Sequence, residues 1–205
     1  CIEQSCFGER RETENPPDSH DPTFAAAIRS LQLGRTLLGE RVTNVSQVID
    51  WLVATDLDST ILPVPIDQTR IHAMGNSLGG ATVMFATAVD DRISGVIAAS
   101  CISTFANMTC RKPAGPDYVI PGILRWLECS DIIALSAPRP FITVTGISDH
   151  LFPFRGTELI IEQAREVYAA LSAESRLQSL AADGGHRFYS EIAWPAFQAQ
   201  IDIDG

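Results

Sequence analysis

A serine between two glycines, in the segment Gly75-Asn76-Ser77-Leu78-Gly79, is the feature of this sequence that points most directly to chemistry. An apolar run at residues 71–74 precedes it, and an alanine-rich segment suited to a helix follows it. In a G-x-S-x-G turn of this kind, glycines let a strand and a helix pass closely, and the serine hydroxyl is pushed out at the carboxyl edge of a sheet. Ser77 is therefore the candidate nucleophile. The alternative is that it only caps the helix that follows.

A serine hydroxyl is a weak nucleophile at neutral pH, so it needs a neighbouring base and a carboxylate that orients the base. Asp149 follows a β-rich run at 141–145, and His186 follows a pair of glycines after a short predicted strand at 176–181. We expect Asp149 to be the orienting acid and His186 to be the base. Each also has an ordinary alternative, Asp149 as a turn-forming residue before Pro153 and His186 as a solvated loop histidine.

The other histidines and the glycines carry weaker signals. His150 is expected to shape the turn beside Asp149, and His20 lies in a polar segment without a partner pattern. His72 falls within the apolar run before Ser77, where a hydrogen-bonded core histidine is expected. The sequence contains neither H-E-x-x-H nor C-x-x-C, and its glycines do not fit G-x-G-x-x-G. We therefore expect no metal and no cofactor.

The hydrophobic periodicity around these residues predicts alternating strands and helices, as in α/β proteins. Strands are expected at 71–74, 93–100, 141–145 and 176–181, and helices at 22–38, 45–52, 80–88, 158–171 and 191–201. Irregular loops are expected at 8–21 and 56–69. The segment 101–128 lacks sustained periodicity. We expect it above the carboxyl edge of the sheet, either as part of an acyl or alcohol pocket or as an ordinary surface loop.

Length and composition suit one globular domain and exclude several classes of function. The 205 residues are 45% hydrophobic and 20% charged, which is enough for a substantial core. Fifteen basic and 25 acidic residues give a net charge of −10, which disfavours nucleic acid as a partner. No apolar stretch reaches the length of a membrane span. Five dispersed cysteines argue against a dense disulfide framework.

Several segments together resemble the α/β-hydrolase superfamily, in its acetyl xylan esterase and dienelactone hydrolase-like branch. The segments that carry the resemblance are 33–35, 48–52, 67–71, 75–80, 88–93, 136–140, 146–153 and 184–186. The chain order Ser77, Asp149, His186 is that of the superfamily and differs from the chymotrypsin and subtilisin orders. The resemblance implies a partial, mostly parallel sheet flanked by helices. It also implies hydrolysis of carboxylic esters of carbohydrates or small molecules through an acyl-enzyme, with the Leu78 amide in the oxyanion hole.

The chain departs from the pattern of the superfamily in two places. Dienelactone hydrolases proper use a cysteine where this chain has Ser77, so a serine esterase is expected instead. Members also place several strands and an oxyanion loop before the serine-bearing strand, whereas the region before Ile71 is mostly helical or polar. Residues 1–205 are therefore expected to be one N-terminally incomplete α/β-hydrolase domain, weakly active at best by itself. Two other functions stay open, a prolyl oligopeptidase-type serine peptidase and a non-catalytic hydrolase scaffold used for binding.

Overall fold

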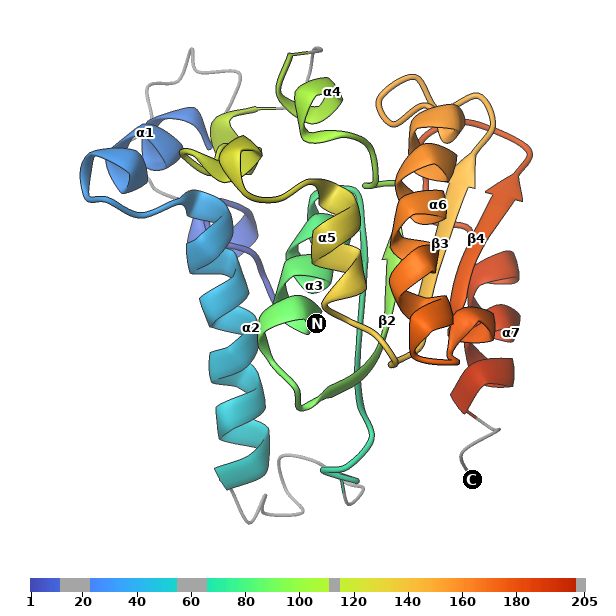
Figure 1. The fold of residues 1–205 in the computed structure, drawn as a ribbon. Helices are drawn as coiled ribbons and strands as arrows, with labels where there is room; N and C mark the ends of the chain where they lie inside the picture. Colours follow the sequence, from blue (N-terminus) through green and yellow to red (C-terminus); the bar gives the residue numbers. More distant parts are fainter. Residues whose placement is uncertain (12–22, 55–65, 111–114, 202–205) are drawn as a thin grey trace.

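The computed structural model describes residues 1–11, 23–54, 66–110 and 115–201, which form a four-stranded sheet flanked by helices (Figure 1). The strands are all parallel and lie in the order of the sequence. They are β1 (Ile71–Asn76), β2 (Ile93–Ala99), β3 (Phe141–Gly146) and β4 (Leu177–Ala182). Because the strands run the same way, their carboxyl ends meet at one edge of the sheet. The four strands expected from the sequence are confirmed, each within two residues at either end.

The helices cover both faces of the sheet. They are α1 (Phe24–Gln32), α2 (Leu37–Ala54), α3 (Leu78–Val89), α4 (Phe105–Cys110), α5 (Cys129–Ala134), α6 (Phe154–Ala170) and α7 (Ser190–Ile201). Helices α3, α5 and α6 pack on one face, α2 packs outside α3, and α7 packs on the opposite face against β2, β3 and β4. Four short 3-10 turns complete the described elements, at Gly8–Arg10, Pro116–Tyr118, Ile123–Arg125 and Glu174–Arg176.

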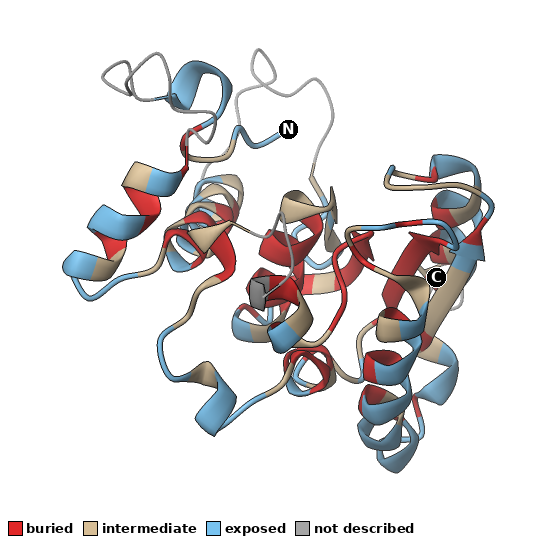
Figure 2. Cartoon of the chain, turned by 90° about the horizontal axis from the view of Figure 1, so that it is seen from above, coloured by how far each residue is buried: buried red, intermediate tan, exposed pale blue. Residues whose placement is uncertain are grey.

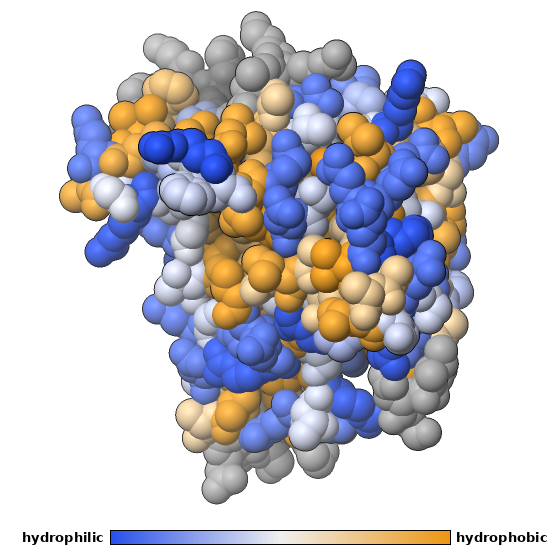
Figure 3. Space-filling view, viewed as in Figure 1, coloured by the Kyte–Doolittle hydropathy of each residue, from blue (hydrophilic) through white to orange (hydrophobic). Residues whose placement is uncertain are grey.

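Burial follows the layers, because the central strands are covered on both sides (Figure 2). Every residue of β3 is buried, and so are six of the seven residues of β2. Strands covered on both sides read as nearly continuous apolar runs rather than as alternating patterns. Helix α6 shows the contrasting pattern. It buries Ile160, Ile161 and Ala164 at helical spacing, while hydrophilic side chains cover much of its outward surface (Figure 3).

The N-terminal helices differ from the sequence-based expectation. One helix was expected over 22–38 and another over 45–52, whereas α1 ends at Gln32 and α2 runs without a break from Leu37. The chain turns at Gly34, whose φ of +71° is a left-handed conformation that ends helices and that glycine adopts without strain. Leu38 continued the apolar spacing of the first helix, so the periodicity concealed this break. The expected loop at 56–69 lies largely outside the described residues, as does most of the loop at 8–21.

Strand β1 lies at one edge of the sheet. Among the described residues it pairs with β2 alone, and residues 1–4 form no strand beside it. Its burial is correspondingly incomplete, and 51% of Met74 is exposed. A hydrophobic parallel strand is therefore open along one side in this part of the chain.

Candidate active site

Ser77 occupies a strained turn between β1 and α3. Its backbone angles are φ 55° and ψ −122°, a conformation that residues other than glycine seldom adopt and that concentrates at functional sites. The Ser77 amide donates to the Ala99 carbonyl at 2.8 Å, which ties the turn to the end of β2. Within the described part of the chain the Ser77 side chain makes no capping hydrogen bond to α3. The geometry is therefore that of a strained strand-to-helix turn and does not support the alternative in which Ser77 only caps the helix.

The glycines around Ser77 make the turn sterically possible. A Cβ on Gly75 would overlap the Gly79 backbone and lie 2.7 Å from the Gly80 nitrogen. A Cβ on Gly80 would lie 2.8 Å from both the Ala99 carbonyl oxygen and a cysteine sulfur. At Gly79 the nearest atom, in a glutamine side chain, would be 3.5 Å away, which is ordinary contact. Close approach of strand and helix thus depends on Gly75 and Gly80, and the second glycine of the G-x-S-x-G pattern is less constrained than we expected.

Leu78, the candidate oxyanion donor, is the first residue of α3. The first amides of a helix have no partner within the helix, and the helix dipole places positive charge at that end. The Thr82 hydroxyl holds the Leu78 carbonyl with a hydrogen bond of 2.9 Å. The start of α3 therefore offers a backbone donor next to Ser77.

The structure brings Asp149 and His186 into direct contact. Asp149 lies just beyond the carboxyl end of β3 with its side chain fully buried, and its Oδ2 is 2.8 Å from Nδ1 of His186. A carboxylate accepts hydrogen bonds, so Nδ1 carries the hydrogen and Nε2 is left as the basic nitrogen. The other oxygen, Oδ1, accepts from the amides of Leu151 at 2.9 Å and Phe152 at 3.0 Å. Asp149 thus shapes its turn and also orients a histidine.

Backbone hydrogen bonds join the loop that carries Asp149 to the loop that carries His186. The Ile147 amide donates to the Ala182 carbonyl, and the Ser148 amide donates to the Gly184 carbonyl, both at 2.9 Å. These bonds extend the pairing of β3 with β4 past the ends of the strands. The acid and the base are therefore held together by the sheet itself as well as by their own hydrogen bond.

Two side chains that the sequence analysis did not single out also hold the histidine loop. The Tyr189 hydroxyl donates to the Gly185 carbonyl at 2.6 Å. The Ser100 hydroxyl, at the end of β2, donates to the Arg187 carbonyl at 3.1 Å. Ser100 has a positive φ of 48°. No local pattern marks either residue, because each acts through a backbone carbonyl that only folding brings near it.

Ser77 lies at the same edge of the sheet as the acid and the base, on the far side of β2. The hydrogen bonds of the described residues include the contact between Asp149 and His186 but none between the Ser77 hydroxyl and His186. The structure therefore joins two of the three candidate residues directly and places the third on a neighbouring part of one edge.

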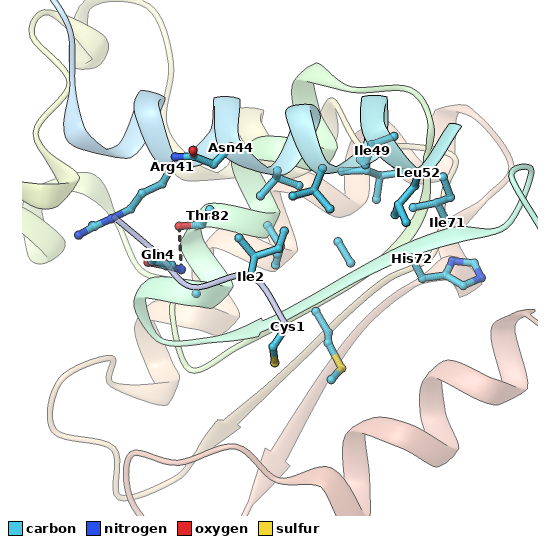
Figure 4. Close-up of a pocket in the computed structure, with 17 residues that line it drawn as sticks. Cys1, Ile2, Gln4, Arg41, Asn44, Ile49, Leu52, Ile71, His72 and Thr82 are labelled. Carbon is cyan, nitrogen blue, oxygen red and sulfur yellow. Dashed lines mark hydrogen bonds between the residues drawn. The ribbon is translucent and has the colours of Figure 1, made fainter. Parts of the chain in front are cut away.

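A separate cavity of about 420 Å³ lies between α2 and β1, and its lining includes none of the three candidate residues. Ile49 of α2 and Ile71 of β1 line it, and the Gln4 amide donates to the Thr82 hydroxyl at 3.3 Å across one end (Figure 4). The cavity follows the side of β1 that lacks a strand partner among the described residues. The cavity therefore belongs to the open edge of the sheet and is separate from the candidate catalytic residues.

His72 also borders this cavity, and its environment differs from the expected one. Its ring meets Phe197 of α7 edge-on, with ring centroids 5.1 Å apart. Its Nδ1 is buried without a hydrogen-bond partner in the described structure, so the expectation of a hydrogen-bonded core histidine is wrong for that atom. Burial, aided by Arg70, lowers the pKa of His72 below its usual value. His72 thus packs against Phe197 beside the cavity.

Two other kinds of site are absent from the part of the chain that the structure describes. Within residues 1–11, 23–54, 66–110 and 115–201, no three His, Cys, Asp or Glu side chains are grouped so as to hold a metal ion. No helix in these ranges has the length and apolar character needed to cross a membrane. The described cysteines Cys1, Cys6, Cys101 and Cys129 are free thiols.

The chain resembles known proteins in sequence and in fold. No family model matches the chain. In sequence, it is 28% identical over 161 residues to "Putative hydrolase YtaP" of Bacillus subtilis, a match that spans 76% of this chain and 50% of that protein. The chain therefore spans about half the length of this relative.

Similar solved structures include several esterases. A glucuronoyl esterase from Solibacter usitatus has a TM-score of 0.67 at 15% identity and covers 94% of this chain and 53% of its own. A "putative acetyl xylan esterase" of Bacteroides fragilis has a TM-score of 0.67 at 19% identity, over 95% and 47% of the two chains. A glucuronoyl esterase from Sporotrichum thermophile has a TM-score of 0.63 at 18% identity, over 81% and 51%. The chain has the fold of part of these α/β-hydrolase esterases, which confirms the resemblance at the level of the fold.

Proposed function

We propose that this chain carries the catalytic residues of a serine carboxylester hydrolase that works through an acyl-enzyme. The observation that carries the proposal is the 2.8 Å bond between Asp149 and His186, which leaves the outer imidazole nitrogen basic at the edge of the sheet where Ser77 sits in a strained turn. The likeness of the fold to glucuronoyl and acetyl xylan esterases supports an ester of a carbohydrate as the class of substrate.

In the proposed reaction, Nε2 of His186 takes the proton of the Ser77 hydroxyl as the serine oxygen attacks the ester carbonyl carbon. The carbon–oxygen bond to the alcohol then breaks, and the same nitrogen gives its proton to the departing alcohol. A water molecule, activated by His186 in turn, attacks the acyl group and releases the acid. Asp149 holds the imidazole in one tautomer and stabilises its positive charge in both halves of the cycle.

The negative charge on the carbonyl oxygen would be stabilised by the backbone amide of Leu78, with a second donor from elsewhere in the protein. We propose that residues 1–205 are the C-terminal portion of one α/β-hydrolase domain, which is consistent with their covering about half of the similar proteins. Losing one oxyanion donor costs roughly 100-fold to 1000-fold in rate. Weak activity is therefore expected from these residues alone.

The test is covalent labelling of the complete protein by a fluorophosphonate, with hydrolysis of p-nitrophenyl acetate measured in parallel. Ser77→Ala should abolish both signals, and His186→Ala should suppress labelling because the serine loses its base. Ser175→Ala, at an exposed serine outside the site, is the matched control and should behave like the wild type. Undiminished turnover by folded Ser77→Ala would refute the proposal. A folded wild-type protein that takes up no label would favour the non-catalytic scaffold.

A further inference from the structure

Phe152 contacts both members of the acid–base pair. Its backbone amide donates to Oδ1 of Asp149 at 3.0 Å. Its ring stacks on the imidazole of His186, with centroids 5.7 Å apart and ring planes 21° from parallel. The side chain is buried, with 6% of the residue exposed. One residue, three positions after the acid, therefore touches the carboxylate through its backbone and the base through its ring.

The stacking supplies a constraint that the hydrogen bond to Asp149 does not. The hydrogen bond at Nδ1 restrains one atom of the ring, so coupled rotation about the two side-chain torsions of His186 can still tilt the imidazole. Such rotation would swing Nε2 away from a substrate oxygen or from the Ser77 hydroxyl. An aromatic ring lying nearly parallel to the imidazole face opposes this rotation, because tilting either ring brings their atoms into contact.

Phe152 is itself supported by Tyr118, which belongs to the segment 101–128. The two rings are 6.4 Å apart between centroids and tilted by 58°. Tyr118 is buried, and burial raises the pKa of its phenol above the usual value, so the ring presents a neutral, rigid body. The rings thus form a chain of contacts in which Tyr118 packs on Phe152 and Phe152 stacks on His186, the candidate base.

The turn that carries Tyr118 is anchored to the helical layer. Asp117 forms a buried ion pair with Arg41 of α2 at 2.8 Å, with side-chain exposures of 7% and 0% respectively. The Thr23 hydroxyl, just before α1, donates to the other oxygen of the same carboxylate at 2.5 Å. A buried pair of this kind is costly to break, so the turn has a fixed position relative to α2.

From this geometry we propose that Phe152 is a positioning residue that sets the orientation of the His186 imidazole, and that Tyr118 buttresses it. The proposal rests on the proposed function, in which His186 is the base. The proposal also assigns a role to the segment 101–128. From the sequence, two interpretations of this segment stayed open, part of a substrate pocket or an ordinary surface loop. Through Tyr118 this segment supports the catalytic geometry rather than only bordering it.

The experiment compares Phe152→Leu with Phe197→Leu in the complete protein. Both substitutions remove a buried ring, and Phe197 also packs on a histidine, His72, that takes no part in the candidate site. For p-nitrophenyl acetate, Phe152→Leu should lower kcat on the order of 10-fold to 100-fold, as a misplaced catalytic group does, with KM nearly unchanged. Phe197→Leu should lower the thermal midpoint without changing kcat. Phe152→Tyr keeps a flat ring and should restore most of the lost rate.

Equal losses of kcat in the two leucine variants, or failure of Phe152→Tyr to restore the rate, would overturn the proposal. If Phe152→Leu does not fold, Tyr118→Leu provides the same test one contact further from His186 and should lower kcat by a smaller factor. NMR of the His186 Nδ1 proton gives a readout that does not need turnover. Its exchange with solvent should be faster in Phe152→Leu than in the wild type, and unchanged exchange contradicts positioning. Failure of the proposed function is distinguished by Ser77→Ala, which would then leave hydrolysis intact.

Discussion

Both carboxylate oxygens of Asp149 take part in hydrogen bonds, and the two oxygens have different partners. Oδ1 is held by two backbone amides, so the carboxylate plane is fixed before the histidine is considered. Oδ2 is thereby aimed at Nδ1 of His186, and the Asp149 side chain is fully buried. A charged acceptor held in this way selects the tautomer of the histidine and, in the proposed mechanism, would stabilise the positive charge that forms on the imidazole.

Replacing that carboxylate tests its role at the scale of one residue. Asp149→Asn keeps the shape of the side chain but removes the charge, and its amide nitrogen can turn toward His186 and impose the wrong tautomer. We expect kcat for p-nitrophenyl acetate to fall by roughly 10³-fold to 10⁴-fold, as in other Ser-His-Asp triads, with a much smaller change in KM. Asp91→Asn, at an exposed turn residue, is the control and should have no effect. A loss of less than tenfold in folded Asp149→Asn would contradict the role of orienting acid.

Some residues of the candidate site could be proposed from the sequence, and others could not. Ser77, Asp149 and His186 could be proposed because each follows a predicted strand and belongs to a type that such chemistry requires. The contact between Asp149 and His186 agrees with that expectation. Phe152 and Ser100 could not be proposed, because an apolar residue in a loop and a serine after a strand are common, and their partners are distant in sequence.

Among the elements, the loops after β3 and β4 depend on the absence of a side chain at Gly146. A Cβ there would overlap the carbonyl oxygens of Gly184 and Gly185 and lie 2.6 Å from the hydroxyl of Tyr189. These oxygens belong to backbone that cannot rotate away as a flexible side chain could. The two loops can therefore approach closely because residue 146 is a glycine. The hydrogen bond between Asp149 and His186 depends on this close approach.

Because of this dependence, we expect alanine substitutions at Gly146 and Gly185 to have unequal effects on kcat. Gly146→Ala must displace the histidine loop, and we expect kcat to fall on the order of 100-fold, as for a base misplaced by about 1 Å. At Gly185 the nearest atom to an added Cβ, a carbonyl oxygen, would be 4.0 Å away, so Gly185→Ala should stay close to the wild type. Steady-state kinetics on both variants, with circular dichroism to verify folding, decides the matter. Similar activities for the two alanine variants would show that the approach of the loops is not limiting.

Periodicity was a good guide to these elements where a strand or helix buries a regular pattern, and it failed where a break is set by one dihedral angle. The four strands and helices α3 and α7 match their expected positions closely. Helix α6 begins four residues before its expected start, and the short helices α4 and α5 were not expected. The break between α1 and α2 was not expected either, because Gly34 turns the chain while the apolar spacing continues past it. Nor could the position of Tyr118 be predicted, since a buried ion pair between Asp117 and Arg41, 76 positions apart in sequence, sets it.

Across the whole molecule, the alternation of strands and helices predicted the class of fold, whereas the arrangement of layers depends on contacts between distant segments. The open side of β1 is the most consequential of these features. Parallel strands are normally covered on both edges and faces, and exposed edges promote pairing between molecules. Exposed Met74 and the apolar cavity beside β1 add surface that favours such contacts.

We expect the 205 residues, produced alone, to associate as their concentration rises, as measured by multi-angle light scattering. Met74→Lys should reduce the association, because a charge on an edge strand opposes pairing with another strand. Val167→Lys, which changes an exposed apolar residue on α6, is the control and should leave the association as it was. A monodisperse monomer that melts in one cooperative transition at every concentration would count against this expectation.

Among the described residues, Ser77 follows the edge strand β1, whereas Asp149 and His186 follow two strands that pair with each other, so the parts of the candidate site differ in resilience. Fraying of the sheet at β1 would carry the hydroxyl away while the carboxylate and imidazole kept their bond. Hydrolysis would then be lost while nearly all of the secondary structure was still present. For residues 1–205 alone, inactivation in mild denaturant would report the separation of β1 from β2, before the rest of the sheet unfolds.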